Sequence, residues 1–193
     1  NPANFKGFAW VGIDADLNGS IDAFLGLNFQ GNSSSIEIID SGSGANTSPS
    51  TTTISNSAYK TYATSTSNYD YRQVNYLTDG GTTNDMTPLS TGDPDYYASF
   101  LVPFADVAAF LAGKSINITD QTPLRYVVAT STQANSLNQD LGGVNGGVNS
   151  TTTWEALGGF SQTVTANGTV VPEPTTGLLA LFSVASLVIR RRR

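Results

Sequence analysis

The chain has 193 residues, a net charge of −6 and neither cysteine nor histidine, which excludes disulfide bonds, the usual Cys/His zinc sites, cysteine nucleophiles and histidine general bases. Residues 172–193 hold four of the nine basic residues and one of the fifteen acids, so five basic and fourteen acidic residues remain upstream, a net charge of −9. A domain with this charge is not expected to bind nucleic acid by neutralising phosphates.

The residues before the tail show the short apolar and alternating runs that are typical of β-strands, separated by loops rich in Ser, Thr, Asn and Gly. The first strands are expected at Gly7–Ile13, Ala23–Gln30 and Ile36–Ile39, and residues 41–57 are expected to form a polar loop. Later strands are expected at Tyr59–Tyr62, Asn68–Leu77, Tyr96–Val102, Ser115–Ile118, Leu124–Thr130, Trp154–Leu157, Phe160–Thr165 and Thr169–Val171.

One segment has helical spacing. Phe104–Leu111 starts directly after Pro103 and ends before Gly113, which are typical residues at the start and the end of a helix. Many short strands with a single short helix favour two packed layers of antiparallel strands. We therefore predict that residues 1–170 form an all-β domain, an antiparallel β-sandwich of jelly-roll-like form with one short helix.

The loop after the first strand carries the strongest chemical signal within the domain. It has oxygen-bearing side chains at positions 1, 3, 5 and 9 and a glycine at position 6, which matches the first nine positions of a calcium loop. Together with the backbone carbonyl of position 7, the candidate calcium ligands are Asp14, Asp16, Asn18, Ser20 and Asp22. Position 12 is Leu25, and no helix flanks the loop, so it is not an EF-hand.

This loop resembles the Asp-rich calcium loops that join strands in extracellular β domains, where calcium has a structural role. The alternative is an ordinary β-turn, in which the Asp and Asn side chains accept hydrogen bonds from backbone amides.

Tyrosines are a second candidate binding feature: Tyr69, Tyr71 and Tyr76 are placed to stack on sugar rings if they line an open sheet face. Their alternative role is packing between strands.

The last residues form a three-part tail. Pro172, Glu173 and Pro174 are expected to be extended and accessible, because proline is unsuited to helix interiors and to central strands. Residues 175–189 form an apolar segment of about 22 Å as a helix, which spans a hydrocarbon core of about 30 Å only if the bilayer thins or arginine stems snorkel. The terminal residues Arg190, Arg191, Arg192 and Arg193 are expected to stay cytoplasmic and leave residues 1–171 outside. The alternative for the apolar segment is a buried core helix.

This order of motif, short transmembrane helix and basic terminus resembles the PEP-CTERM sorting signal of exosortase substrates. The resemblance covers Val171–Arg193 and implies that a membrane-embedded exosortase recognises Pro172, Glu173 and Pro174 and removes the apolar tail. It also implies an exported bacterial protein, transiently anchored in the inner membrane and destined for the cell surface or the extracellular matrix, often with the exopolysaccharide of a biofilm. Asp93–Phe160 further resembles domains of exported surface proteins that have no established activity.

Three functions of different classes are compatible with these sequence features. The favoured one is a non-catalytic surface or matrix protein with a structural calcium loop, and the alternative is a carbohydrate-binding module for exopolysaccharide. An exported hydrolase is the least favoured, because no nucleophile motif and no distinctive pair of carboxylates stands out. No signal peptide is visible at Asn1, so a processed or truncated N-terminus is expected.

Overall fold

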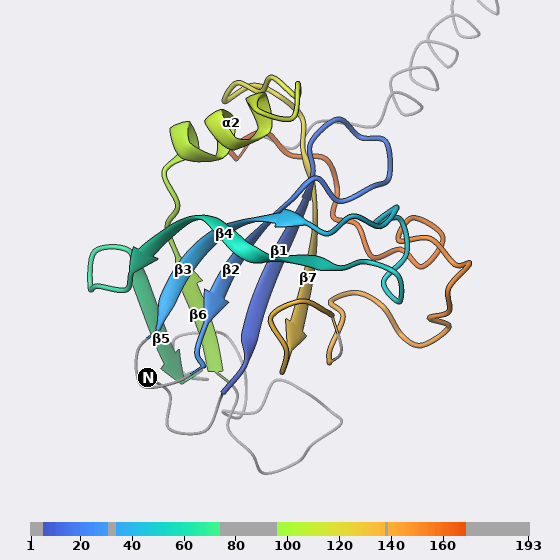
Figure 1. The fold of residues 1–193 in the computed structure, drawn as a ribbon, viewed down its shortest axis with the longest axis horizontal. Coiled ribbons are helices and arrows are strands. Elements are labelled where there is room, and N and C mark those ends of the chain that lie inside the picture. The colour runs from blue at the N-terminus through green and yellow to red at the C-terminus, as the bar shows by residue number, and fades with distance from the viewer. Residues whose placement is uncertain (1–5, 31–33, 74–95, 138, 169–193) are drawn as a thin grey trace, which may run out of the picture.

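The computed structural model describes residues 6–30, 34–73, 96–137 and 139–168. Its main element is a five-stranded antiparallel sheet with the strand order β4-β3-β2-β1-β7, and two further strands pair as a separate sheet, β5-β6 (Figure 1). The elements are β1 (Phe8–Asp14), β2 (Ala23–Asn28), β3 (Ser35–Ser41), β4 (Ile54–Ala63), β5 (Tyr69–Gln73), β6 (Tyr96–Phe100), α2 (Phe104–Ala112) and β7 (Arg125–Ser131).

The two faces of the main sheet are covered by different parts of the chain. Successive residues of a strand point to opposite faces, so Trp10 packs on one face and Ile13 on the other. The Trp10 face is covered by the irregular segment that follows β7, with Trp154 fully buried against it. The Ile13 face is covered by α2 through Phe110 and Leu111. Because both faces are covered, β1 and β2 are apolar along almost their whole length.

The helix lies where its sequence predicts it. α2 begins after Pro103 and buries one side against the sheet. Asp106 in its first turn accepts a hydrogen bond from the hydroxyl of Tyr62 at 2.6 Å and forms an ion pair with the ammonium of Lys60 at 2.6 Å. The Lys60 ammonium and the Tyr62 hydroxyl hold the pKa of Asp106 below its ordinary value. These contacts tie the start of the helix to β4.

Three of the predicted strands are wrong: residues 115–118, 154–157 and 160–165 form turns and loops. Ser115 has a φ of 67°, which no extended strand adopts. Residues 154–158 form a turn, in which the carbonyl of Trp154 accepts a hydrogen bond from the amide of Gly159 at 3.0 Å. Val164 makes one isolated bridge to Leu124. A strand requires a continuous partner edge as well as β-branched residues, and residues 160–165 make only isolated backbone hydrogen bonds across to Leu124 and Tyr126.

The predicted class is confirmed for the described residues, which form antiparallel sheets with one short helix. The polar loop ends earlier than expected, because β4 already begins at Ile54. In the described part of the chain, no helix is both long and apolar enough to cross a bilayer. The predicted span 175–189, the motif Pro172–Pro174 and the basic tail Arg190–Arg193 all lie outside the described residues.

Candidate functional site

The loop between β1 and β2 brings three carboxylates together at one end of the main sheet. One oxygen from each of Asp14, Asp16 and Asp22 lies within 4.8 Å of the others. Asp14 is the last residue of β1, and the amide of Asp22 donates to the carbonyl of Ile13 at 2.8 Å just before β2 begins. The strand pairing therefore fixes both ends of the loop, and Asp14 and Asp22 are buried there.

The side chains at positions 1, 3, 5 and 9 each accept backbone amides of the same loop. Asp14 accepts the amides of Asn18 at 3.1 Å and Gly19 at 3.0 Å, and Asp16 accepts that of Asn18 at 3.2 Å. Asn18 accepts the amide of Ser20 at 2.8 Å. Asp22 accepts the amide of Ala15 at 2.8 Å. These bonds hold the carboxylates in a fixed arrangement, and they are also the bonds that the β-turn interpretation predicts.

Two residues of the loop have a left-handed backbone. Gly19 has a φ of 86°, as expected for the sharp turn at position 6. Leu17 has a φ of 61°, which costs a residue with a side chain about 1–2 kcal/mol. Sequence reasoning gave Leu17 no role. The hydrogen bonds that the adjacent Asn18 amide donates to Asp14 and Asp16 help to hold this conformation.

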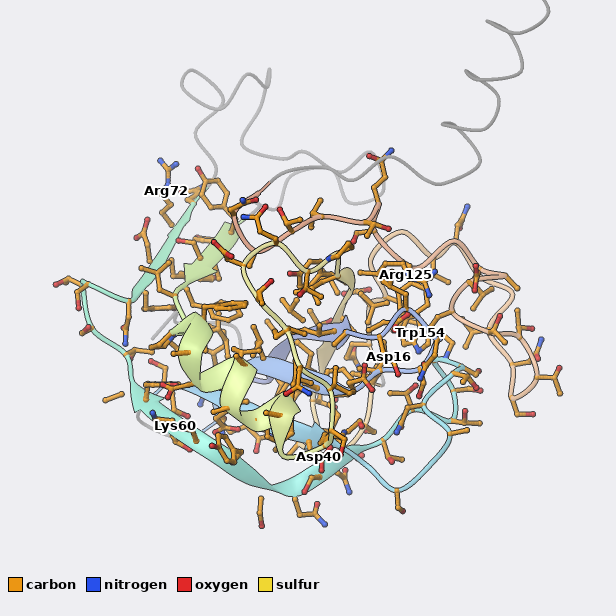
Figure 2. All side chains as sticks on the ribbon, turned by 90° about the horizontal axis from the view of Figure 1, so that it is seen from above. Asp16, Asp40, Lys60, Arg72, Arg125 and Trp154 are labelled. Carbon is orange, nitrogen blue, oxygen red and sulfur yellow. The ribbon has the colours of Figure 1, made fainter. Side chains whose placement is uncertain are left out.

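A guanidinium lies against the buried carboxylate. Arg125 donates to Oδ2 of Asp14 from Nη2 at 2.6 Å and from Nε at 3.2 Å. Its side chain is 14% exposed, lies over the ring of Phe160 at 4.4 Å, and reaches Glu155 at 3.7 Å. In Figure 2, Arg125, Asp16 and Trp154 lie near one another, away from Lys60 and Arg72. Sequence reasoning missed Arg125, since only the pairing of Asp14 with Arg125 between β1 and β7 brings it here.

The ionised form of Asp22 is disfavoured within the acidic cluster. Burial raises the pKa of Asp22 above its ordinary value, and the nearby charges of Asp16 and Asp14 raise it further. The amide of Ala15 and the ammonium of Lys114 act in the opposite direction. A cation held between the three carboxylates would relieve this repulsion.

The donor set fits a hard divalent cation. Calcium prefers carboxylate, amide and carbonyl oxygens, and the loop presents all three kinds. The hydroxyl of Ser20 donates to the carbonyl of Ala45 at 2.6 Å, so Ser20 would contribute its backbone carbonyl, as the loop pattern predicts. Arg125 and Lys114 together bring two positive charges to a cluster of three carboxylates, which leaves the cluster net negative.

Two of the three candidate sugar-stacking tyrosines contact other aromatic rings. Tyr69 lies 6.0 Å from Phe29, and Tyr71 stacks on Tyr96 with centroids 5.2 Å apart and an interplanar angle of 6°. Burial raises the pKa values of the hydroxyls of both Tyr69 and Tyr71. These contacts favour the packing interpretation for β5 and β6. Tyr76 lies outside the described residues.

No known protein family, curated protein or solved structure matches the chain. Its function is therefore inferred from its own residues. Two features carry that inference: the tail Val171–Arg193, read from the sequence, and the acidic loop 14–22, whose geometry the structure describes.

Proposed function

We propose that this chain is a non-catalytic domain of an exported bacterial cell-surface or extracellular-matrix protein, sorted by an exosortase. The observation that carries the proposal is the order of the tail: a Pro-Glu-Pro motif, an apolar segment and four terminal arginines. The membrane helix anchors the chain transiently in the inner membrane, with the domain of residues 1–170 outside. The domain itself is a jelly-roll-like sandwich, a proposal supported by the packing of Tyr69 and Phe100 of the small sheet against Leu27 and Ile36 of the main sheet.

Processing of the tail can be measured on the surface-exposed protein. Mass spectrometry of the released form is expected to show a C-terminus near Pro172–Pro174 and no arginine tail. Glu173→Ala is expected to leave the tail intact and the protein in the membrane fraction, because it removes the one charge of the motif. Glu155→Ala, a change of the same type outside the motif, is expected to be processed normally. Recovery of Arg193 in the released wild-type protein would contradict the proposal.

We further propose that the loop 14–22 binds calcium in a structural role. The supporting observation is that Asp14, Asp16 and Asp22 place carboxylate oxygens within 4.8 Å of one another. Bound there, calcium would neutralise the cluster and hold the end of β1 to the start of β2. No chemical step is assigned to the metal, since its expected contribution is stability.

Calcium binding predicts a metal-dependent melting temperature. Calcium at a hundredfold excess over its dissociation constant is expected to add about 2.7 kcal/mol to the free energy of unfolding, and a chelator to remove it. Asp16→Asn is the informative variant, because Asp16 is exposed and hydrogen-bonds within the loop, to Asn18. It is expected to lose most of the calcium effect, whereas Asp120→Asn, an exposed residue outside the loop, keeps it. Identical wild-type melts with calcium and with chelator would make the loop an ordinary turn.

A further inference from the structure

A polar cleft borders the acidic loop and shares Ser20 and Asp22 with it, but the function proposed above does not use the cleft as a binding site. Its volume is about 780 Å³, within the range of about 300–1,000 Å³ that is typical of small-molecule sites. It is formed by the end of the acidic loop, the connection from β3 to β4, the start of β4 and the turn after α2. Its lining includes Asp22, Asp40, Ser43, Asn56, Lys114 and Asn135.

The wall formed by the β3–β4 connection is held in place by a buried amide. Asn46 is 4% exposed, and its Nδ2 donates to the carbonyls of Gly42 at 2.8 Å and Gly44 at 2.9 Å. Its Oδ1 accepts the amide of Thr53 at 3.2 Å, and the amide of Gly42 donates to the carbonyl of Thr53 at 2.6 Å. A wall with its backbone fixed in this way loses little conformational freedom when a ligand binds.

The charges in the cleft disfavour an anionic ligand. Nζ of Lys114 donates to Oδ1 of Asp40 at 2.8 Å and to the carbonyl of Asp22 at 2.6 Å. The positive charge of Lys114 is therefore already paired with a carboxylate of the protein. The lining contains two carboxylates and this single ammonium. A phosphate or a carboxylated ligand would therefore meet a net negative surface. Figure 2 shows Asp40 close to the C-terminal end of α2, where Lys114 follows.

The remaining groups suit a ligand that is rich in hydroxyls. The lining is dominated by hydroxyls, side-chain amides and backbone groups, which disfavours an apolar ligand. A sugar hydroxyl both donates and accepts, so neighbouring hydroxyls of one ring pair well with a carboxylate and an amide set side by side. Asp40 in β3 offers such a carboxylate, since its side chain is 46% exposed, and Asn56 in the neighbouring strand β4 offers an exposed amide.

We propose that this cleft binds the neutral sugar units of a glycan. The site is separate from the tyrosines of β5 and β6, and it requires neither their stacking nor calcium in the acidic loop. Binding here would give the domain a direct contact with polysaccharide, through hydrogen bonds to Asp40 and Asn56 and their neighbours.

The proposal is tested by titrating the full ¹⁵N-labelled chain in a detergent without a sugar headgroup. Cellotetraose, maltotetraose and xylotetraose are the neutral probes, and a hyaluronan tetrasaccharide is the anionic one, all at one calcium concentration. At least one neutral probe is expected to cause saturable amide shifts at residues 41–44 and 54–56. The absence of saturable shifts with every neutral probe, shifts centred on β5 and β6, or tighter binding of hyaluronan would each overturn the proposal.

Variants decide whether the shifts arise in the cleft. Ser43→Trp places a large side chain at an exposed position of the lining and is expected to abolish binding. Asp40→Asn removes a charged acceptor at nearly constant shape and is expected to weaken binding about tenfold or more. Asp120→Asn, which makes the same change away from the cleft, is expected to bind as the wild type does. Thermal melts report whether each variant is folded, and unchanged affinity in folded Ser43→Trp would overturn the proposal.

Discussion

Gly26→Ala is expected to destabilise the domain by about 3 kcal/mol, the upper end of the usual cost of overpacking a core. Gly26 pairs directly with Trp10 between β2 and β1, and the six-membered ring of the indole occupies the space where a side chain at position 26 would lie. A Cβ at position 26 would lie 2.1 Å from Cζ3 of Trp10. Trp10 cannot move away easily, since it is 1% exposed and stacks on Phe8 at 5.1 Å. Chemical denaturation measures the loss as a lower midpoint at an unchanged slope.

The same substitution at Gly113 is the control. Gly113 follows α2 with a φ of −60° and a ψ of −20°, which alanine adopts readily, and its change is expected to have little effect. Trp10→Leu alone should also destabilise, because it leaves a cavity. The double variant Gly26→Ala/Trp10→Leu is expected to be more stable than the sum of the two changes predicts, since the clash is gone. Strict additivity would contradict the packing described for Gly26.

Asp14→Ala is expected to cost about 3–5 kcal/mol, the usual effect of removing one partner from a buried ion pair. Asp14 is fully buried and accepts the guanidinium of Arg125 at 2.6 Å. Without this carboxylate, the only ion pair left to Arg125 among the described residues is a longer one with Glu155. The amide of Gly19 loses its acceptor, and the amide of Asn18 keeps only Asp16. The loss measured in chelator reports the ion pair alone, whereas in calcium the loss of a metal ligand is expected to add to it.

Two further variants test this explanation. Asp14→Ala/Arg125→Met removes both charges and is expected to recover part of the lost stability, because no unpaired guanidinium remains buried. Asp70→Ala removes one partner of an ion pair in which Asp70 is 65% exposed and Arg72 is 51% exposed, and it is expected to change stability little. If Asp14→Ala lowered the free energy of unfolding as little as Asp70→Ala does, the ion pair between Asp14 and Arg125 would not stabilise the domain as described.

The local pattern of the chain was enough to predict most of the regular elements. β1, β2 and β7 follow from runs of apolar and β-branched residues, and α2 follows from its helical spacing after Pro103. The turn of the acidic loop also follows from the sequence, because Gly19 supplies its left-handed backbone and the Asp and Asn side chains accept nearby amides. These features depend on residues close together in the chain, so periodicity and residue type are sufficient to reveal them.

Other features depend on residues far apart in the chain. Arg125 reaches Asp14 only because β7 pairs with β1 in one register, and no local motif marks it as part of the loop. The composition of residues 154–157 predicts a strand, but these residues form a turn. The turn places Trp154 against one face of the main sheet, where its Nε1 donates a hydrogen bond to Oγ1 of Thr52 at 3.1 Å.

The sequence by itself determined the all-β class, the position of the helix, the acidic loop and the motif of the tail, because each is a property of neighbouring residues. The tertiary structure alone decided the partner of Asp14, the packing of Tyr69 and Tyr71 against other rings, and the cleft beside Asp40. These depend on which strands pair and which segments cover each face. Pairing and coverage are set by the burial of apolar surface over the whole domain, which a local pattern does not contain.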